Sequence, residues 1–101
     1  MTDTTRRLSR QTVDVLQALA GQGDGWLYGL EIAAATGLKS GSLYPILIRL
    51  DERGLLEGRW TPSDRPGRPP RHAYRITDAG RSALREALAA APALKLKGSA
   101  A

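Results

Sequence analysis

The chain has 101 residues, of which 42% are hydrophobic and 25% are charged, as in one ordinary globular domain rather than a disordered or membrane-spanning chain. It contains no cysteine and one histidine, which excludes disulfides and thiolate metal sites and leaves little material for zinc or imidazole chemistry. The net charge of +5 favours a polyanionic partner. Because the sequence carries neither a spanning apolar run nor a signal peptide, we expect a cytoplasmic protein without a membrane partner.

The first predicted helix runs from about Ser9 to Ala20. Val13, Leu16 and Ala20 recur at helical spacing and form its apolar stripe. Residues 1–7 are polar, and we expect a flexible arm there. The glycine-rich GQGDG at 21–25 ends the helix, and Trp26, Leu27 and Tyr28 after it can form a very short strand.

A helix pair follows. The second helix is predicted over 29–35, with Leu30, Ala33 and Ala34 as its packing face, and residues 36–38 form the turn. The third helix begins at Ser40 or Ser42 and ends near Arg53, with Leu43, Ile46, Leu47 and Leu50 pointing inward. Pro45 lacks a backbone donor, so it is tolerated in the first turn if Ser42 caps the helix, and one hydrogen bond is lost if the helix starts at Ser40.

Two β-like runs, 55–61 and 71–77, flank a loop with four prolines that fits neither helix nor strand. Within the strands we expect four inward residues: Leu56, Trp60, Tyr74 and Ile76. Between Arg59 and Arg75 there are five arginines and one acid, Asp64, so this hairpin carries +4 of the net charge. Positive charge concentrated on one element is typical of a nucleic-acid interface.

A last helix is predicted over 78–92, capped by Thr77 and ended by Pro92. We expect it to mediate dimerisation, because a 100-residue monomer has little left to cover its apolar stripe; the alternative is that it packs only on its own domain. The dimerisation residues would be Leu84, Ala87, Leu88 and Ala91. Residues 8–77 would form the DNA-binding domain, and 93–101 a flexible tail.

The order of these elements is helix, helix-turn-helix, strand hairpin and helix. It predicts an α+β fold, mainly α with a small β-hairpin, of the winged helix-turn-helix type. In such a fold one helix can enter the major groove of DNA while the hairpin reaches phosphates or the minor groove.

Three segments carry a resemblance to a known family: YGLEI at 28–32, TGLKSGSLYPILIRLDERGLL at 36–56 and RHAYRITDAG at 71–80. They resemble the PadR family of bacterial transcriptional regulators, most specifically in G-S-L-Y-P followed by R-L-x-E-R-G-L. The resemblance implies a cytoplasmic regulator, usually a repressor, that binds palindromic operators as a homodimer through the third helix and the wing. With only one helix after the wing, the chain is similar to the short members of that family.

At the amino end of the third helix, hydroxyls, an ammonium group and free N–H groups can hold a phosphate, although an ordinary cap has the same residues. Further along the outer face, Tyr44 and Pro45 match the family's signature step, and Arg49 can reach a base edge or phosphate or pair with Glu52. Ile48 can touch a thymine methyl group or simply be exposed. The DNA-contact candidates on this helix are Lys39, Ser40, Gly41, Ser42, Tyr44, Pro45 and Arg49.

On the wing, the candidates for phosphate or minor-groove contact are Arg65, Arg68 and Arg71, against the alternative of plain solubility charge. Trp60 and Tyr74 are expected in the core rather than as stacking platforms for bases, and His72 as a solvated wing residue.

These observations predict a sequence-specific transcriptional regulator, most simply a repressor, whose partner is double-stranded DNA. Alternatives are a winged-helix protein–protein interaction module and an accessory DNA-binding factor of a mobile element. We find no paired carboxylates, catalytic triad, metal cluster or phosphate-cradling loop, so we expect no enzyme activity, cofactor or metal. The sequence does not decide whether the protein binds a small-molecule effector.

Overall fold

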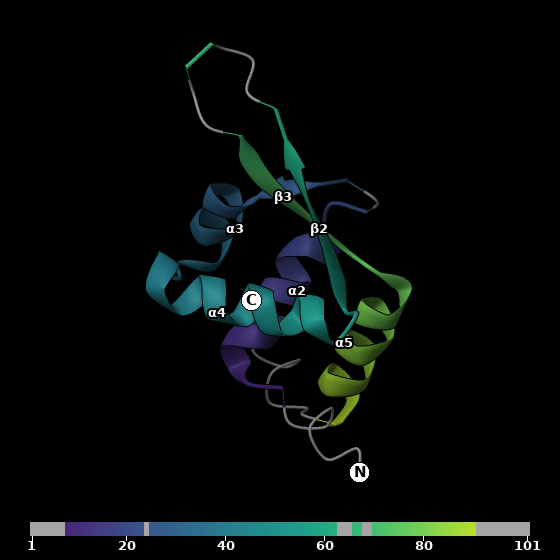
Figure 1. The fold of residues 1–101 in the computed structure, drawn as a ribbon. Coiled ribbons are helices and arrows are strands. Elements are labelled where there is room, and N and C mark those ends of the chain that lie inside the picture. The colour runs from purple at the N-terminus through teal and green to yellow at the C-terminus, as the bar shows by residue number, and fades with distance from the viewer. Residues whose placement is uncertain (1–7, 24, 63–65, 68–69, 91–101) are drawn as a thin grey trace.

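A computed structural model describes residues 8–23, 25–62, 66–67 and 70–90 (Figure 1). Its elements are α2 (Arg10–Ala20), β1 (Leu27–Tyr28), α3 (Gly29–Thr36), α4 (Ser40–Glu52), β2 (Leu56–Thr61), β3 (Arg71–Ile76) and α5 (Asp78–Ala90). The mixed α and β architecture predicted from the sequence is therefore confirmed, including the short strand before α3. In the described part of the chain, no helix is long and apolar enough to cross a bilayer.

Side-chain caps set the starts of two helices. The Ser9 hydroxyl accepts a hydrogen bond from the Thr12 N–H at 3.1 Å, so α2 begins at Arg10. The Thr77 hydroxyl accepts from the Gly80 N–H at 3.0 Å and donates to the Gly54 carbonyl at 2.7 Å. Thr77 thus caps α5, as predicted, and also ties its start to the turn that precedes β2.

Helix α4 takes the earlier of its two possible starts. It begins at Ser40, with Lys39 as the capping position, so Pro45 lies inside the helix. The proline has no N–H to donate to the carbonyl four residues earlier, that of Gly41. Gly41 is exposed, so water can satisfy this carbonyl and the helix continues through the proline.

The three strands form one antiparallel sheet in the order β1-β3-β2. At one end of the hairpin Leu56 pairs with Ile76, and towards the other end Trp60 pairs with His72. The far ends of β2 and β3 project past α3 and α4 (Figure 1). Its two ends therefore have different surroundings, buried near Leu56 and exposed near Thr61.

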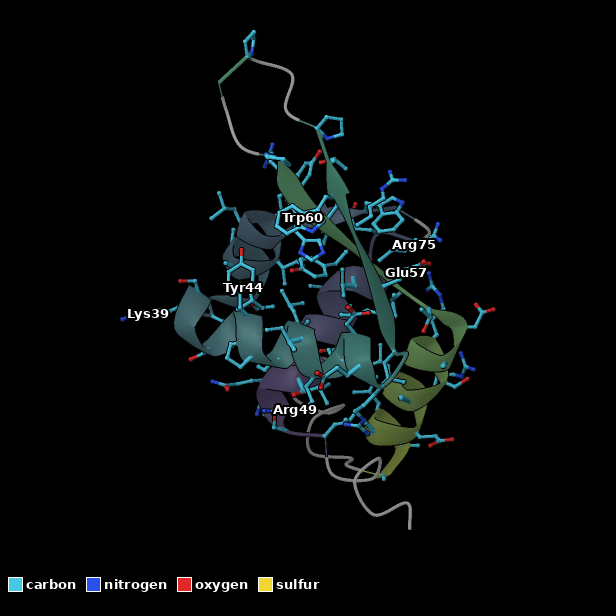
Figure 2. All side chains as sticks on the ribbon, viewed as in Figure 1. Lys39, Tyr44, Arg49, Glu57, Trp60 and Arg75 are labelled. Atoms are coloured by element: carbon cyan, nitrogen blue, oxygen red, sulfur yellow. The ribbon has the colours of Figure 1, made fainter. Side chains whose placement is uncertain are left out.

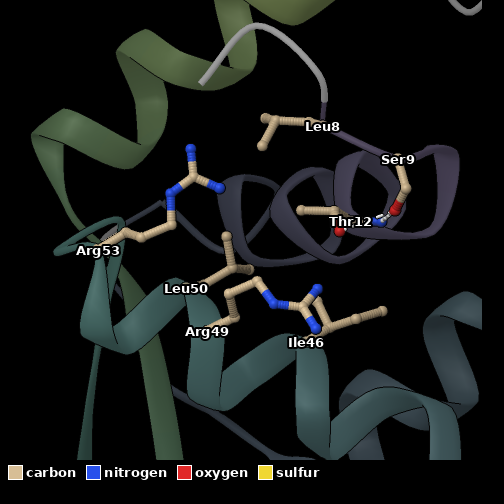
Figure 3. Close-up of a pocket in the computed structure, with 7 residues that line it drawn as sticks. All are labelled: Leu8, Ser9, Thr12, Ile46, Arg49, Leu50 and Arg53. Carbon is tan, nitrogen blue, oxygen red and sulfur yellow. Dashed lines mark hydrogen bonds between the residues drawn. The ribbon is translucent and has the colours of Figure 1, made fainter. Parts of the chain in front are cut away.

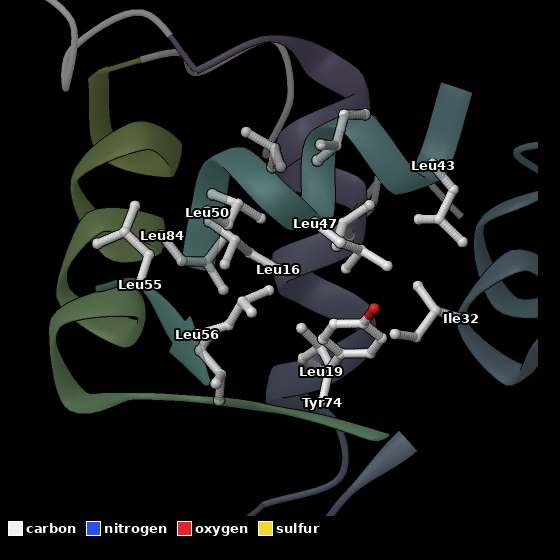
Figure 4. Close-up of a cluster of buried hydrophobic side chains, with 14 residues drawn as sticks. Leu16, Leu19, Ile32, Leu43, Leu47, Leu50, Leu55, Leu56, Tyr74 and Leu84 are labelled. Carbon is white, nitrogen blue, oxygen red and sulfur yellow. The ribbon is translucent and has the colours of Figure 1, made fainter. Parts of the chain in front are cut away.

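The core lies where α2 meets α4, α5 and the base of the sheet (Figure 4). All four predicted inward residues of α4 are buried, and so are Val13 and Leu16 of α2. Helix α3 differs from the prediction. Ile32 is fully buried, whereas Leu30 is 74% exposed and Ala34 is exposed. The sequence GLEIAAAT is apolar almost all round, so its periodicity does not define a face.

The prediction that Trp60 lies in the core is wrong: 67% of it is exposed. Strand alternation places Trp60 on the same sheet face as the buried Leu56, so the predicted sheet face of Trp60 is correct. However, Trp60 is four residues further along the hairpin, beyond the helices that cover this face. Tyr74 is only 4% exposed, as predicted.

The apolar stripe of α5 faces its own domain. Leu84 is 8% exposed and belongs to the hydrophobic core, while Ala83, Ala87 and Leu88 are half-buried against it. The expectation that a monomer leaves this stripe uncovered is therefore wrong for Leu84. Ala91, also predicted at the interface, lies outside the described residues.

Candidate nucleic-acid interface

The start of α4 combines exposed polar groups with free backbone donors. Lys39, Ser40, Gly41 and Ser42 are all exposed, and the first turn contains no acidic residue. The Ser42 and Leu43 N–H groups both donate to the Lys39 carbonyl at 2.9 Å, whereas no helical partner exists for the N–H groups of the first residues. The hydroxyls, the ammonium group and the positive end of the helix dipole suit this turn to a phosphate.

The outer face of α4 carries the residues that the helical wheel directs away from the core. Tyr44 is 37% exposed and Ile48 is 59% exposed, and Pro45 and Arg49 are exposed as well. Tyr44 points from α4 towards the hairpin, and Trp60 projects from the hairpin on the same side (Figure 2). The wheel therefore placed these residues on the correct side of the helix.

Arg49 lies on the other flank of α4, towards α2. It lines a shallow pocket of about 320 Å³ together with Arg53, Ile46 and the residues around Ser9 (Figure 3). Its guanidinium group lies between α4 and the start of α2 in this view. Arg49 and Tyr44 thus lie on opposite flanks of the helix, with Ile48 between them on the wheel.

Two of the hairpin arginines are held against one aromatic ring. Arg59 and Arg75 lie over the Trp26 ring, 4.2 and 4.7 Å from its centroid, and Arg75 pairs with Glu57 at 2.6 Å. These contacts are on the sheet face opposite Trp60, because neighbouring residues of a strand point to opposite sides. Both arginines therefore stabilise the back of the sheet through cation–π contacts.

Arg71 is the one wing candidate that the structure describes. It is exposed, and its guanidinium carbon lies 3.7 Å from the centroid of the Tyr28 ring. This contact links the wing to the residue that precedes α3. The other two wing candidates, Arg65 and Arg68, lie outside the described residues.

Three rings are stacked on the front face of the hairpin. The Trp60 and His72 rings are stacked, with their centroids 4.4 Å apart and their planes at 18°. The centroids of the His72 and Tyr74 rings are also 4.4 Å apart, with the planes tilted by 34°. The Tyr74 hydroxyl and His72 Nδ1 are joined by a hydrogen bond of 3.0 Å. Burial, with smaller contributions from Tyr44 and Asp51, raises the pKa of Tyr74 above its ordinary value. His72 is consequently part of a ring stack rather than a solvated residue.

One groove joins the elements. It has a volume of about 560 Å³ and lies between the start of α3, the outer side of α4 and the front of the hairpin. Its lining residues are Tyr28, Gly29, Leu30, Tyr44, Ile48, Trp60, Pro70, Arg71, His72 and Tyr74. The outer side of α4 and the front of the hairpin therefore form one continuous surface. Sequence reasoning missed Leu30 and Trp60 as surface residues, because their apolar character signalled burial.

A helix-turn-helix followed by a β-hairpin and a further helix defines a winged helix, a fold that many DNA-binding regulators of transcription share. The model of the PadR-like family of transcriptional regulators matches residues 15–86. The chain belongs to this family. Comparison with curated protein sequences returns no match.

Solved structures agree with this assignment. A PadR family regulator from Eggerthella lenta is 30% identical, with a TM-score of 0.66, and the match covers 89% of this chain and 81% of that one. BpsR of Bordetella bronchiseptica is 25% identical, with a TM-score of 0.71 and coverages of 96% and 67%.

Bacillus subtilis PadR, solved in complex with operator DNA, shares the fold at 24% identity and a TM-score of 0.66. The match covers 76% of this chain but only 45% of Bacillus subtilis PadR, so the chain spans less than half the length of that protein.

Proposed function

We propose that the chain is a sequence-specific repressor that binds a palindromic operator as a homodimer. In this proposal α4 enters the major groove and the hairpin contacts the adjacent phosphates or the minor groove. The observation that carries it is the shared surface: Tyr44 and Ile48 of α4 and Arg71 of the hairpin line one groove, so both elements can face the same duplex. It would act in the cytoplasm and require no cofactor.

The start of α4 would hold a phosphate through Lys39, Ser40, Gly41 and Ser42. Their exposure leaves hydroxyls, ammonium and N–H groups accessible to DNA. Tyr44, Pro45 and Arg49 would contact the major groove and its edges. Because Arg49 lies on the α2 flank, it would contact the DNA on the side away from the wing.

The wing would contribute charge rather than sequence readout. Arg71, with Arg65 and Arg68, would contact phosphates or the minor groove. The strand arginines Arg59 and Arg75 would not take this role, because their guanidinium groups lie over Trp26 and neither residue lines the groove that Arg71 lines.

Dimerisation would use α5. Ala87 and Leu88 are only half-buried by their own domain, and together with Ala91 they would complete their burial against a partner copy. Leu84 would support this contact from within the core. A two-fold dimer presents two copies of α4, which a palindromic operator requires.

Selection of bound sequences from a random duplex library tests this function. The expected result is a palindromic consensus whose half-sites are about 10 base pairs apart, one helical turn. Arg49→Ala should change the selected sequence. Arg59→Ala removes the same charge from the back of the sheet and should leave the selected sequence unchanged. Selection without enrichment would count against a sequence-specific regulator and favour a protein-binding module.

A further inference from the structure

The most exposed large apolar side chains lie together. Among the described residues these are Leu30, Tyr44, Ile48 and Trp60, and every one lines the groove between α3, α4 and the hairpin. Single exposed apolar residues are ordinary, but a contiguous apolar patch on a small soluble domain marks a binding surface. The front of this molecule therefore has an apolar strip as well as cations.

Trp60 is held in place at this surface by the ring stack beneath it. His72 lies under the Trp60 ring, and Tyr74, which is buried, lies next to His72. Gly58 makes room for the stack, since a Cβ there would lie 2.6 Å from His72 Nε2 and 3.3 Å from the Tyr74 ring. A large ring is thus presented to the groove on a support that is anchored in the core.

The charge of the groove favours an anion. Arg71 lies at its rim, and none of the described residues that line it carries a carboxylate. A suitable occupant therefore combines apolar carbon surface with negative charge. A DNA strand has this alternation, because each deoxyribose presents C–H groups and lies between two phosphates.

We propose that the groove receives the sugar–phosphate strand that separates the major groove from the minor groove, and that Trp60 packs against a deoxyribose of that strand. The inference rests on the proposed function. With α4 in the major groove and the hairpin directed to the minor groove, the strand between the two grooves must cross the surface between α4 and the hairpin. That surface is the apolar groove.

The consequence is discrimination against ribose at this position. A 2′-hydroxyl placed against the Trp60 ring would lose water without gaining a hydrogen-bond partner. Apolar packing releases no counterions, so the Trp60 contact contributes affinity that does not depend on salt. The groove would therefore make the protein specific for DNA independently of the bases that α4 reads.

The test uses the full chain and the selected operator duplex, with a 2′-hydroxyl introduced at one nucleotide at a time. One or two positions in each half-site should weaken binding about fivefold or more. Trp60→Ala should weaken binding of the all-deoxy operator about tenfold while keeping the log–log salt slope. In that variant the ribose penalty, meaning the loss of affinity caused by the 2′-hydroxyl at those positions, should fall to within about twofold.

Two controls isolate the contact. Trp26→Ala removes the same side chain from the opposite sheet face and should leave the ribose penalty unchanged. A 2′-hydroxyl at the duplex end reports the effect of the sugar itself. Thermal melting of each variant, followed by circular dichroism, verifies that the fold is retained.

Three results would overturn the inference. The first is that no single 2′-hydroxyl weakens binding of a tightly bound operator, and the second is that the 2′-hydroxyl weakens binding equally in Trp60→Ala. The third is unchanged operator affinity in that variant. The last would leave the groove to another partner, such as a protein. Because these results presuppose a bound operator, they leave the proposed function standing. A library from which no duplex is selected would overturn the proposed function itself, and this inference with it.

Discussion

The Tyr44 hydroxyl lies in the space that a side chain at position 29 would occupy. A Cβ at Gly29 would overlap this hydroxyl and approach the ring carbon that bears it to 3.0 Å. Gly29 is the first residue of α3 and Tyr44 projects from α4, so the glycine determines how closely the ring lies against the neighbouring helix. The orientation of Tyr44 towards the hairpin therefore depends on the absence of a side chain at position 29.

Gly29→Ala should displace Tyr44 and weaken operator binding by about tenfold, because the ring must rotate out of the groove. The unfolding free energy should change by less than about 1 kcal/mol, since alanine favours the helix and Tyr44 can move into solvent. Fluorescence anisotropy titrations and urea denaturation measure the two quantities. Tyr44→Phe lacks the hydroxyl and serves as the control: Gly29→Ala should cost less affinity in that background. An equal loss in both backgrounds would contradict this account.

Gly80→Ala should destabilise the fold. A Cβ at Gly80 would overlap the Leu55 carbonyl oxygen and lie 2.7 Å from a side-chain carbon of Ile76, and the backbone at this junction cannot shift freely. We expect a loss of about 1–3 kcal/mol in the unfolding free energy, measured in urea. Gly41→Ala is the matched control, because a Cβ there meets no atom within 4 Å. That variant should gain about 0.5 kcal/mol from the helix preference of alanine. Equal stability of the two variants would show that the junction is not tightly packed.

Stability should fall in alkaline solution through Tyr74. Burial raises the pKa of its phenol in the folded state, so the folded protein holds this proton more tightly than the unfolded chain does. The Tyr74 contribution is fully present below the unfolded pKa of about 10 and is lost as the pH rises through the folded pKa. Urea denaturation between pH 8 and pH 11 (roughly the window around that unfolded value) measures it. Tyr74→Phe should show a shallower decline. Parallel declines in the two proteins would rule out Tyr74 as the source.

Operator binding should weaken steeply with salt. About six phosphate contacts per dimer correspond to a log–log slope near −5. Arg68→Ala should reduce the slope by about 2, because a homodimer loses one phosphate contact in each protomer, and it should weaken all sequences alike. Arg49→Ala should instead alter the preference among operators. Titrations at several salt concentrations measure these effects. A slope near zero would contradict the phosphate contacts assigned to the wing, and a sequence-blind loss from Arg49→Ala would contradict the role assigned to α4.

The parts of the fold with long or strongly marked patterns could be predicted from the sequence. Helix α2 has a repeating apolar stripe, and Thr77 is followed by a first turn that its hydroxyl can cap. In α4, the spacing of Leu43, Ile46 and Leu47 defined the buried face, so Tyr44 on the opposite side followed directly. Local patterns of this length determine local structure.

The remainder depends on contacts between distant segments. Alternation gives the sheet face of Trp60 but not how far the helices extend to cover that face. In α3 the face is set by packing of Ile32 on the core and by Glu31, which accepts a hydrogen bond from the Tyr28 N–H at 2.8 Å. The groove itself arises where the hairpin passes α4, and no local pattern encodes that crossing.

The hairpin is anchored at one end only. Leu56 and Ile76 pair inside the core, while the paired strands end at Thr61 and Arg71 on the exposed side. Changes in length or charge between those two strand ends leave the anchored pairs untouched. Natural variation in that segment can therefore change the affinity of such a regulator for its binding site while the domain still folds.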